Sequence, residues 1–196
     1  MNFFDSFYKK DKDQKKMNFS LEVGPHTDLE TLPPVKDVYV TMLPGGDYKE
    51  TAAKSGDLVK KGFNPVPHFP ARSILDEHQL KDFITRCKDV GTKQALVIGG
   101  SRDPIGKFDS SIQILETGFF EGIKIGIAGH PEGSPDISDK ELEKAMMDKK
   151  PYADYIVTQW LLDSQPIVDF ISKQSVPVHV GITGPMKISS LIKFAN

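Results

Sequence analysis

The chain has 196 residues, enough for one large domain or two small ones, and 38% of them are hydrophobic, which can build a core. Its 25 basic and 27 acidic side chains nearly balance, which argues against a general electrostatic grip on nucleic acid. No run approaches the roughly 20 apolar residues of a membrane span, and no signal-peptide core follows the N-terminus. The single cysteine, Cys87, cannot form an internal disulfide. We therefore expect a cytoplasmic protein without a nucleic-acid or membrane partner.

The first 17 residues differ in composition from the rest. Four aromatic side chains are followed by the charged run KKDKDQKK. This segment predicts an amphipathic helix packed on the domain, with a disordered tail as the alternative. Residues 18–196 are predicted to form the domain itself.

Seven apolar runs predict β-strands in this domain. Their starts are about 20 to 30 residues apart, which is the length of one strand–helix unit. Alternating units of this kind form a parallel sheet, either doubly wound or closed as a barrel. The runs are residues 19–23, 38–43, 63–68, 95–99, 123–128, 155–159 and 176–181.

Helical patterns lie between most of these runs. An apolar stripe from Leu80 to Cys87 predicts a helix that ends at Gly91 and places the thiol in the core. A capping box, Ser138-Asp139-Lys140-Glu141, begins a second helix. Pro166 suits the first turn of a third. Residues 47–61, stopped by glycine, form a weaker pattern, and the first connection has room for little helix.

The polar residues near the strand ends distinguish between the two folds. A barrel builds its site from the carboxyl ends of all its strands, whereas a doubly wound sheet concentrates it at one switch point. No G-x-G-x-x-G motif follows any strand. We therefore predict a (βα)8 TIM-type barrel. Six consecutive strands supply such residues: Glu22, Thr41, His68, Asp103, His130 and Gln159.

About seven strands of this barrel are present, and an open barrel would expose an edge and a core. Three explanations follow: the natural chain continues further, a partner completes the barrel, or the fold is different. The first is the one we favour.

Each candidate residue has a simpler alternative. Glu22 is a candidate general acid if it points into the barrel mouth, and otherwise a solvent-facing or salt-bridged side chain. Ser101, Arg102 and Asp103 follow two glycines and could hold a phosphate or a heterocycle, or form an ordinary turn with an internal ion pair.

His68 and Gln159 are equally open. The histidine stands between prolines and is either a ligand contact or a structural residue, and the glutamine in its apolar run bonds a ligand or a core group. No His-x-x-x-His or cysteine pair predicts a metal site. The sequence also contains no G-x-S-x-G motif, so this pattern gives no candidate nucleophile.

Residues 125–163 carry a resemblance to a known family. They read IGIAGHPEGSPD, a helical segment, and then ADYIVTQWLLD. This stretch closely resembles the methylenetetrahydrofolate reductase family, in which a Y-P-E-x-H-P-like loop precedes a helix and an I-T-Q strand. Shorter matches near Glu22, Thr41, His68, Asp103-Pro104 and the seventh strand extend the likeness over nearly all of residues 18–196.

The resemblance implies a barrel that holds FAD and passes hydride from NAD(P)H through the flavin to 5,10-methylenetetrahydrofolate. It assigns Glu22 to protonating the folate, Asp103 to holding the pterin, and Gln159 to bonding folate and nicotinamide in turn. The family's R-G-D reads Ser101-Arg102-Asp103 here, and His130 replaces a tyrosine. The implied flavin site comprises Thr41, His68, Ser101, Arg102, Asp103, His130, Pro131 and Glu132.

Two alternatives to this function stay open. One is a folate-dependent one-carbon enzyme without redox chemistry. The other is a non-catalytic subunit that binds folate or flavin and works with a partner. A homo-oligomer is also among the expected states.

Overall fold

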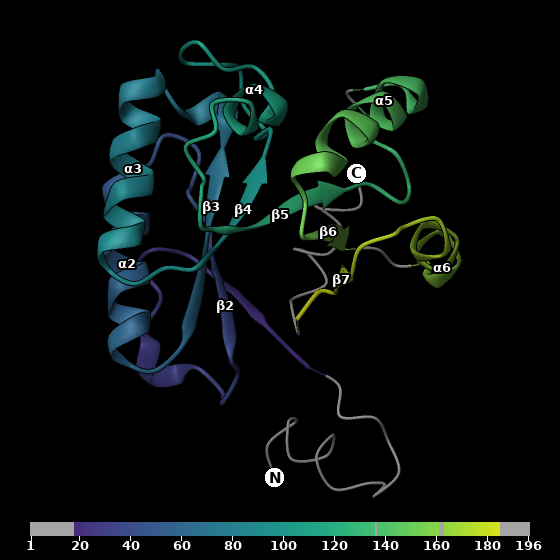
Figure 1. Cartoon of the computed structure of the whole chain (residues 1–196). Helices are drawn as coiled ribbons and strands as arrows, with labels where there is room; N and C mark the ends of the chain where they lie inside the picture. Colours follow the sequence, from purple (N-terminus) through teal and green to yellow (C-terminus); the bar gives the residue numbers. More distant parts are fainter. Residues whose placement is uncertain (1–17, 136, 161–162, 185–196) are drawn as a thin grey trace, which may run out of the picture.

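The structure, a computed structural model, describes residues 18–135, 137–160 and 163–184. Seven parallel strands pair in sequence order within one sheet, so each strand lies beside the next in the chain (Figure 1). All seven predicted strands are present, which confirms a parallel α/β architecture. They are β1 (Leu21–Val23), β2 (Asp37–Val40), β3 (Asn64–Pro70), β4 (Gln94–Ile98), β5 (Lys124–Gly129), β6 (Tyr155–Trp160) and β7 (Val178–Gly181).

Helices connect most strands, as the sequence patterns predict. They are α2 (Tyr48–Lys60), α3 (Glu77–Asp89), α4 (Ser111–Leu115), α5 (Asp139–Lys149) and α6 (Ser164–Ser172), with short 3-10 turns η1 (Leu29–Thr31), η2 (Ala71–Ser73) and η3 (Lys150–Tyr152). The predicted capping box of α5 is confirmed, because the Ser138 backbone N–H donates to Glu141 at 3.0 Å and the Glu141 N–H donates to the Ser138 hydroxyl at 3.4 Å.

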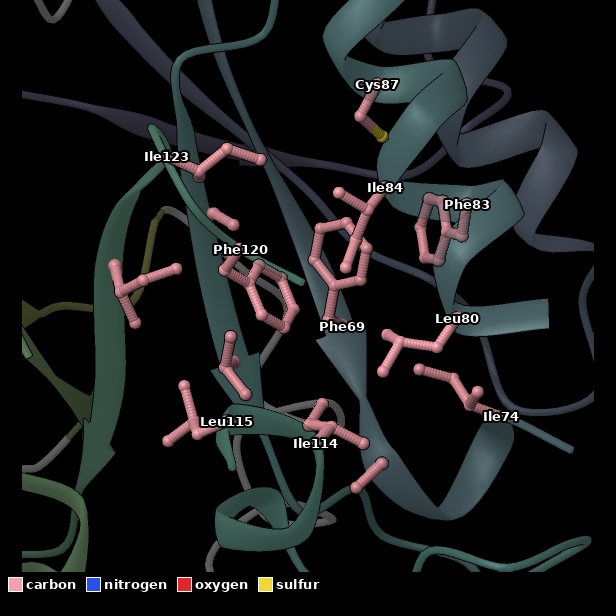
Figure 2. Packing of buried hydrophobic residues seen from close by; sticks show 14 of the residues in the cluster. Phe69, Ile74, Leu80, Phe83, Ile84, Cys87, Ile114, Leu115, Phe120 and Ile123 are labelled. Carbon is pink, nitrogen blue, oxygen red and sulfur yellow. The ribbon is translucent and has the colours of Figure 1, made fainter. Parts of the chain in front are cut away.

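The main hydrophobic core fills the space between the sheet and its helices (Figure 2). Leu80, Phe83 and Cys87 of α3 are fully buried there, which confirms the predicted apolar stripe. The Phe83 ring lies 4.2 Å from the ring of Phe69 on β3. Burial raises the pKa of the Cys87 thiol to about 12, so this residue belongs to the core, as the sequence predicts.

Gly56 lies inside α2 because two helices approach closely there. A Cβ at this position would lie 3.1 Å from the Val90 side chain that follows α3. The glycine that weakens the helical pattern in the sequence is therefore a packing residue.

The sheet is strongly curled. Strands five positions apart in a flat sheet would be separated by about 24 Å, given ~4.8 Å between neighbours. Instead, the hydroxyl of Tyr39 on β2 lies 2.8 Å from Nδ1 of His179 on β7. The described residues thus form a curled, seven-stranded parallel sheet that corresponds to part of a TIM-type barrel.

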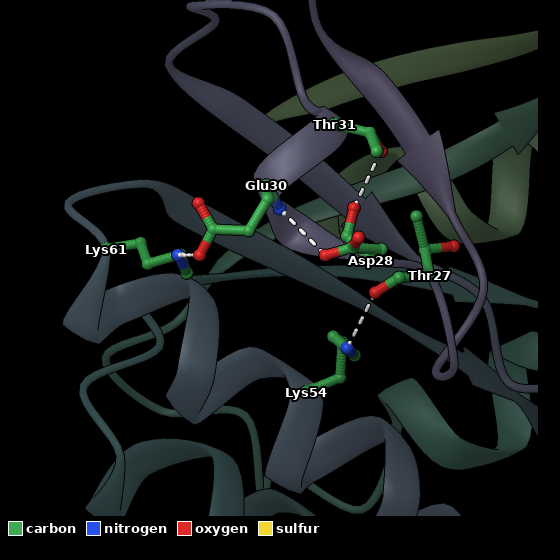
Figure 3. Close-up of polar contacts among 6 residues, drawn as sticks. All are labelled: Thr27, Asp28, Glu30, Thr31, Lys54 and Lys61. Carbon is green, nitrogen blue, oxygen red and sulfur yellow. Dashed lines mark hydrogen bonds and ion pairs between the residues drawn. The ribbon is translucent and has the colours of Figure 1, made fainter.

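The first connection holds β1 against α2 through polar contacts (Figure 3). Lys54 Nζ donates to the Thr27 carbonyl at 2.9 Å, and Lys61 pairs with Glu30. The Asp28 carboxylate accepts the Glu30 backbone N–H at 3.0 Å and so caps η1. These bonds anchor a connection that contains little helix, as predicted.

The sequence analysis missed α4, a helix of five residues. The side chain of Gln113 accepts the backbone N–H of Asp109 at 2.8 Å and stabilises the entry to this helix. Too few apolar residues repeat there for periodicity to reveal a helix. None of the helices in the described ranges is long and apolar enough to cross a membrane.

Gly126 provides a test of the packing inside the curl. It pairs with Tyr155 across β5 and β6, and a Cβ on it would lie 2.5 Å from the fully buried tyrosine ring. We expect Gly126→Ala to lower the free energy of unfolding by about 1–3 kcal/mol, because neither the strand nor the ring can give way. Urea denaturation would measure this change.

Gly99→Ala is the matched control, because nothing lies within 4 Å of a Cβ at that position. It should change the free energy of unfolding by less than about 1 kcal/mol. Equal losses in the two variants would contradict the close approach of Tyr155 to Gly126.

Candidate functional site

The inner face of the curled sheet is lined by alternate residues of each strand. Tyr39, Val66, Leu96 and Tyr155 form a buried cluster there. Since side chains two apart in a strand share a face, His68 follows Val66 onto the same surface, near the carboxyl end of β3. This strand continues to Pro70, two residues beyond the predicted end.

His68 meets Glu22 on this inner surface. The imidazole is only 7% exposed, and its Nε2 has no hydrogen-bond partner in the described part of the chain. Glu22 Oε2 lies 3.9 Å from this nitrogen. That separation is too long for a hydrogen bond, so an unsatisfied ring nitrogen faces a carboxyl group across a narrow gap.

Burial sets the protonation of both groups. Removal from water lowers the pKa of His68 to about 4, so the ring is neutral at pH 7. Glu22 keeps 64% of its side chain exposed, because β1 is an edge strand of the described sheet. Its partial burial still raises the pKa of the carboxyl group. As a result of the two pKa shifts, a neutral base, His68, lies beside an acid, Glu22, that is more easily protonated than an ordinary glutamate.

A line of rings crosses the inner face from this pair toward β7. The ring of Tyr39 meets His68 edge-on, with centroids 6.0 Å apart. The Tyr39 hydroxyl bonds Nδ1 of His179, whose ring stacks on Tyr155 at 4.6 Å. Burial lowers the pKa of His179 and raises that of both tyrosines, so all three are neutral near pH 7. The rings therefore form a neutral aromatic row on the inner face, beside the acid–base pair.

A second set of polar side chains lies where β5 and β6 end. Gln159 Nε2 donates to the Gly133 carbonyl at 3.4 Å, in the loop that contains His130. The side chain of Gln159 is exposed, so the expectation of a buried amide is wrong, because this carboxyl end of β6 extends toward solvent. Burial, and then the charge of Lys149, lower the pKa of His130. Pro131 and Glu132 lie in the same loop.

The remaining predicted residues have other surroundings. The Thr41 hydroxyl donates to the Val23 carbonyl at 3.1 Å, which ties β2 to β1. Ser101 and Asp103 are exposed in the loop after β4, and Arg102 is half-buried. No ion pair joins Arg102 to Asp103 among the residues that the structure describes, so the simple turn with an internal ion pair is not what forms.

The structure therefore brings together some predicted residues but not all of them. Glu22 meets His68, and Gln159 meets the His130 loop. Within the described ranges no hydrogen bond or ion pair joins Glu22, Asp103 and Gln159, although all three stand at carboxyl ends of strands or just beyond. Their predicted roles toward a substrate stay predictions.

Sequence reasoning missed Tyr39, Tyr155 and His179 as parts of the inner face. Strand alternation could have found the tyrosines: Tyr39 shares its face with Thr41, and Tyr155 shares its face with Gln159. The partnership with His179 depends on the curl and has no local signal. In the described ranges, no three His, Cys, Asp or Glu side chains cluster in a way that could hold a metal ion.

The fold resembles TIM-barrel enzymes of known structure. One is a Burkholderia cenocepacia protein provisionally described as a phosphonomutase, with 10% identity and a TM-score of 0.59 over 90% of this chain and 84% of that chain. Another, from the same organism, is provisionally described as a lyase/mutase, with 13% identity and a TM-score of 0.61 over 87% of this chain and 70% of that one. No family model matches the sequence. At these identities the likeness establishes the fold.

These structures contradict the resemblance to methylenetetrahydrofolate reductases. The similar folds are described as a phosphonomutase and a lyase/mutase. The prediction of a flavin-dependent reductase, and of an oxidoreductase in general, rested on the resemblance and is therefore also wrong. The physical reason is that parallel barrels place polar residues at successive strand ends whatever reaction they catalyse. Short motifs at those positions therefore reflect the fold and do not identify the reaction. Binding of FAD and NAD(P)H stays a prediction from the sequence.

The buried His68 predicts a specific pH dependence of stability. The unfolded chain binds a proton near pH 6.5, whereas the folded chain binds it only near pH 4, so stability is lost as the pH falls between these values. Between pH 7 and 4.5 the wild type should lose about 2 kcal/mol more than His68→Gln. Urea unfolding at both pH values would measure it, and parallel losses would contradict the burial of a neutral ring.

Proposed function

We propose that the chain is a non-redox lyase or mutase that acts on a small organic acid at the carboxyl ends of its strands. The unpaired Nε2 of His68, facing Glu22 at 3.9 Å, is the observation that carries this proposal. The descriptions of the two similar structures support the same reaction class. Catalytic groups of TIM-type barrels gather at this end of the sheet, which supports the location.

The protonation states suit acid–base chemistry at neutral pH. A neutral imidazole with a free ring nitrogen can accept a proton, because its lone pair is committed to no other donor. A carboxyl group with a raised pKa is more often protonated than an ordinary glutamate and can return a proton. The narrow gap between Nε2 and Oε2 can be bridged by one substrate group or one water.

A lyase reaction at this pair balances without an oxidant. His68 accepts the proton of a substrate hydroxyl, the O–H electron pair forms a carbonyl, and the adjacent carbon–carbon bond breaks. Its electron pair remains on the leaving fragment as an enolate, which takes a proton from Glu22. The reverse sequence forms the bond, and a mutase would rejoin the fragments differently.

The rest of the inner face supports this assignment. Tyr39, His179 and Tyr155 present neutral rings on the same face, and the edge of the Tyr39 ring helps to bury His68. The exposed amide of Gln159 and the His130 loop stand where β5 and β6 end and are suited to bond the polar end of a small acid.

We also propose that the curled sheet belongs to a complete (βα)8 barrel. Its parallel order and the side-chain hydrogen bond between Tyr39 on β2 and His179 on β7 support this. A cytoplasmic location remains a prediction from the cysteine content, and a homo-oligomer remains one of the expected states.

Replacing either member of the pair tests the proposed chemistry. Glu22→Gln and His68→Gln should each slow the reaction about 100-fold or more, because general acid–base catalysis contributes roughly that much. The assay uses a panel of three- to five-carbon oxo and hydroxy acids, with and without a phosphonate group, in deuterated water. Nuclear magnetic resonance would follow bond cleavage and deuterium uptake next to the carbonyl.

The exposed pair His26 and Glu50 is the matched control, because it has the same two residue types 3.6 Å apart on the surface. His26→Gln and Glu50→Gln should leave the rate unchanged within about twofold. A wild-type protein that turns over no acid of the panel would refute the proposal. So would equal losses in the two pairs.

A further inference from the structure

A pocket of about 440 Å³ lies beside the loops that follow β2 and β4. Gly45 and Gly46 come from the first loop and Arg102 from the second, while Ser73 ends η2 and Gln79 lies in the first turn of α3. Neither Glu22 nor His68 lines this pocket. It is therefore a separate feature from the acid–base pair on the inner face.

Arg102 supplies a positive charge that no neighbour neutralises. Across the described ranges its guanidinium makes no hydrogen bond or ion pair, although it is half-buried at the pocket wall. It lies close to the loop after β2, since a Cβ on Gly45 would lie 3.7 Å from Arg102 Nη1. Gly45 has a φ of 79°, which favours glycine and keeps this approach open. A free guanidinium at a wall can receive a planar or tetrahedral oxyanion.

Ser73 gives an independent indication of a ligand. It is only 4% exposed, it lines the pocket, and its hydroxyl has no hydrogen-bond partner in the part of the chain that the structure describes. Its oxygen is not among the fully buried polar atoms without a partner in the described residues, so it is accessible from the pocket. A ligand in the pocket can therefore bond to it.

The start of α2 places both a favourable and an unfavourable charge beside the pocket. This helix of 13 residues begins at Tyr48, and its N-terminus carries partial positive charge toward the pocket. The Asp47 carboxylate lines the same pocket and accepts the Lys49 backbone N–H at 2.9 Å. This negative charge weakens the attraction for an anion without cancelling the other donors.

We propose that this pocket binds a phosphate-class oxyanion, either free phosphate or the phosphate group of a small ester. Arg102 offers a forked pair of donors and Ser73 a hydroxyl from a different element, and a tetrahedral group can accept from both directions at once. The volume exceeds that of a single phosphate, which leaves room for an organic part. This inference does not depend on the acid–base chemistry of Glu22 and His68.

Calorimetric titration of the full chain with inorganic phosphate, and separately with glycerol 3-phosphate, tests the site at low ionic strength. The wild type should bind at least one of them saturably, and tighter binding of the ester identifies the second source. Arg102→Ala should weaken binding at least tenfold, and Ser73→Ala about threefold. Arg102→Lys should fall between wild type and Arg102→Ala, because it keeps the charge and loses the fork.

Two further variants make the test specific. Asp47→Asn should tighten binding at least twofold, because it removes the opposing charge while asparagine still caps α2. Lys107→Ala is the matched control for Arg102→Ala: Lys107 is a cation of the same loop, it lies outside the pocket, and it pairs with Glu77 at 3.9 Å. It should change affinity less than twofold. Circular dichroism melts would verify that each variant is folded.

Absence of saturable binding in the wild type would overturn the proposal. So would equal weakening by Arg102→Ala and Lys107→Ala, which would indicate general charge attraction. Loss of phosphate binding in His68→Gln would place the anion on the inner face and would also overturn it. Retained binding in a catalytically inactive His68→Gln supports it, and full activity in that variant would refute the proposed function alone.

Discussion

The curl of the parallel sheet is the constraint on which the rest of the structure depends, and the hydrogen bond between Tyr39 and His179 marks it. This bond joins β2 to β7, which stand far apart in the order of the sheet, and it is made inside the curl. A sheet that brings these two side chains together is curled around its inner face. The curl buries His68 beside the cluster of Tyr39, Val66, Leu96 and Tyr155, while the larger apolar layer lies under the helices.

The outer and inner faces of the sheet have different structural roles. The outer face packs on α2 and α3 through residues such as Phe69 and Val97, and it supplies most of the buried apolar area. The inner face is too narrow for that role, and Gly126 makes room for the ring of Tyr155. Stability is therefore concentrated outside, which leaves the carboxyl ends of the strands free to carry polar groups.

Position within the fold gives the same residue types different surroundings. His26 and Glu50 form a solvent-exposed pair on the surface. His68 and Glu22 form a similar pair on the inner face, where burial lowers the pKa of the histidine and raises that of the glutamate. Arg102 shows a further consequence, because the close approach of the β2 loop turns an arginine of a surface loop into the wall of a pocket.

The sequence by itself determined the parallel α/β order, the apolar stripe of α3, the capping box of α5 and the polar residues at the strand ends. These features are local, because periodicity and capping chemistry act over a few neighbouring residues. The tertiary structure alone decided that Glu22 faces His68, that Tyr39 reaches His179, and that Gln159 is exposed. Those outcomes depend on curl and burial between distant segments, which no short motif encodes. The same limit explains why motif likeness suggested a reductase: it reflected where a barrel places polar groups and carried no information about the reaction.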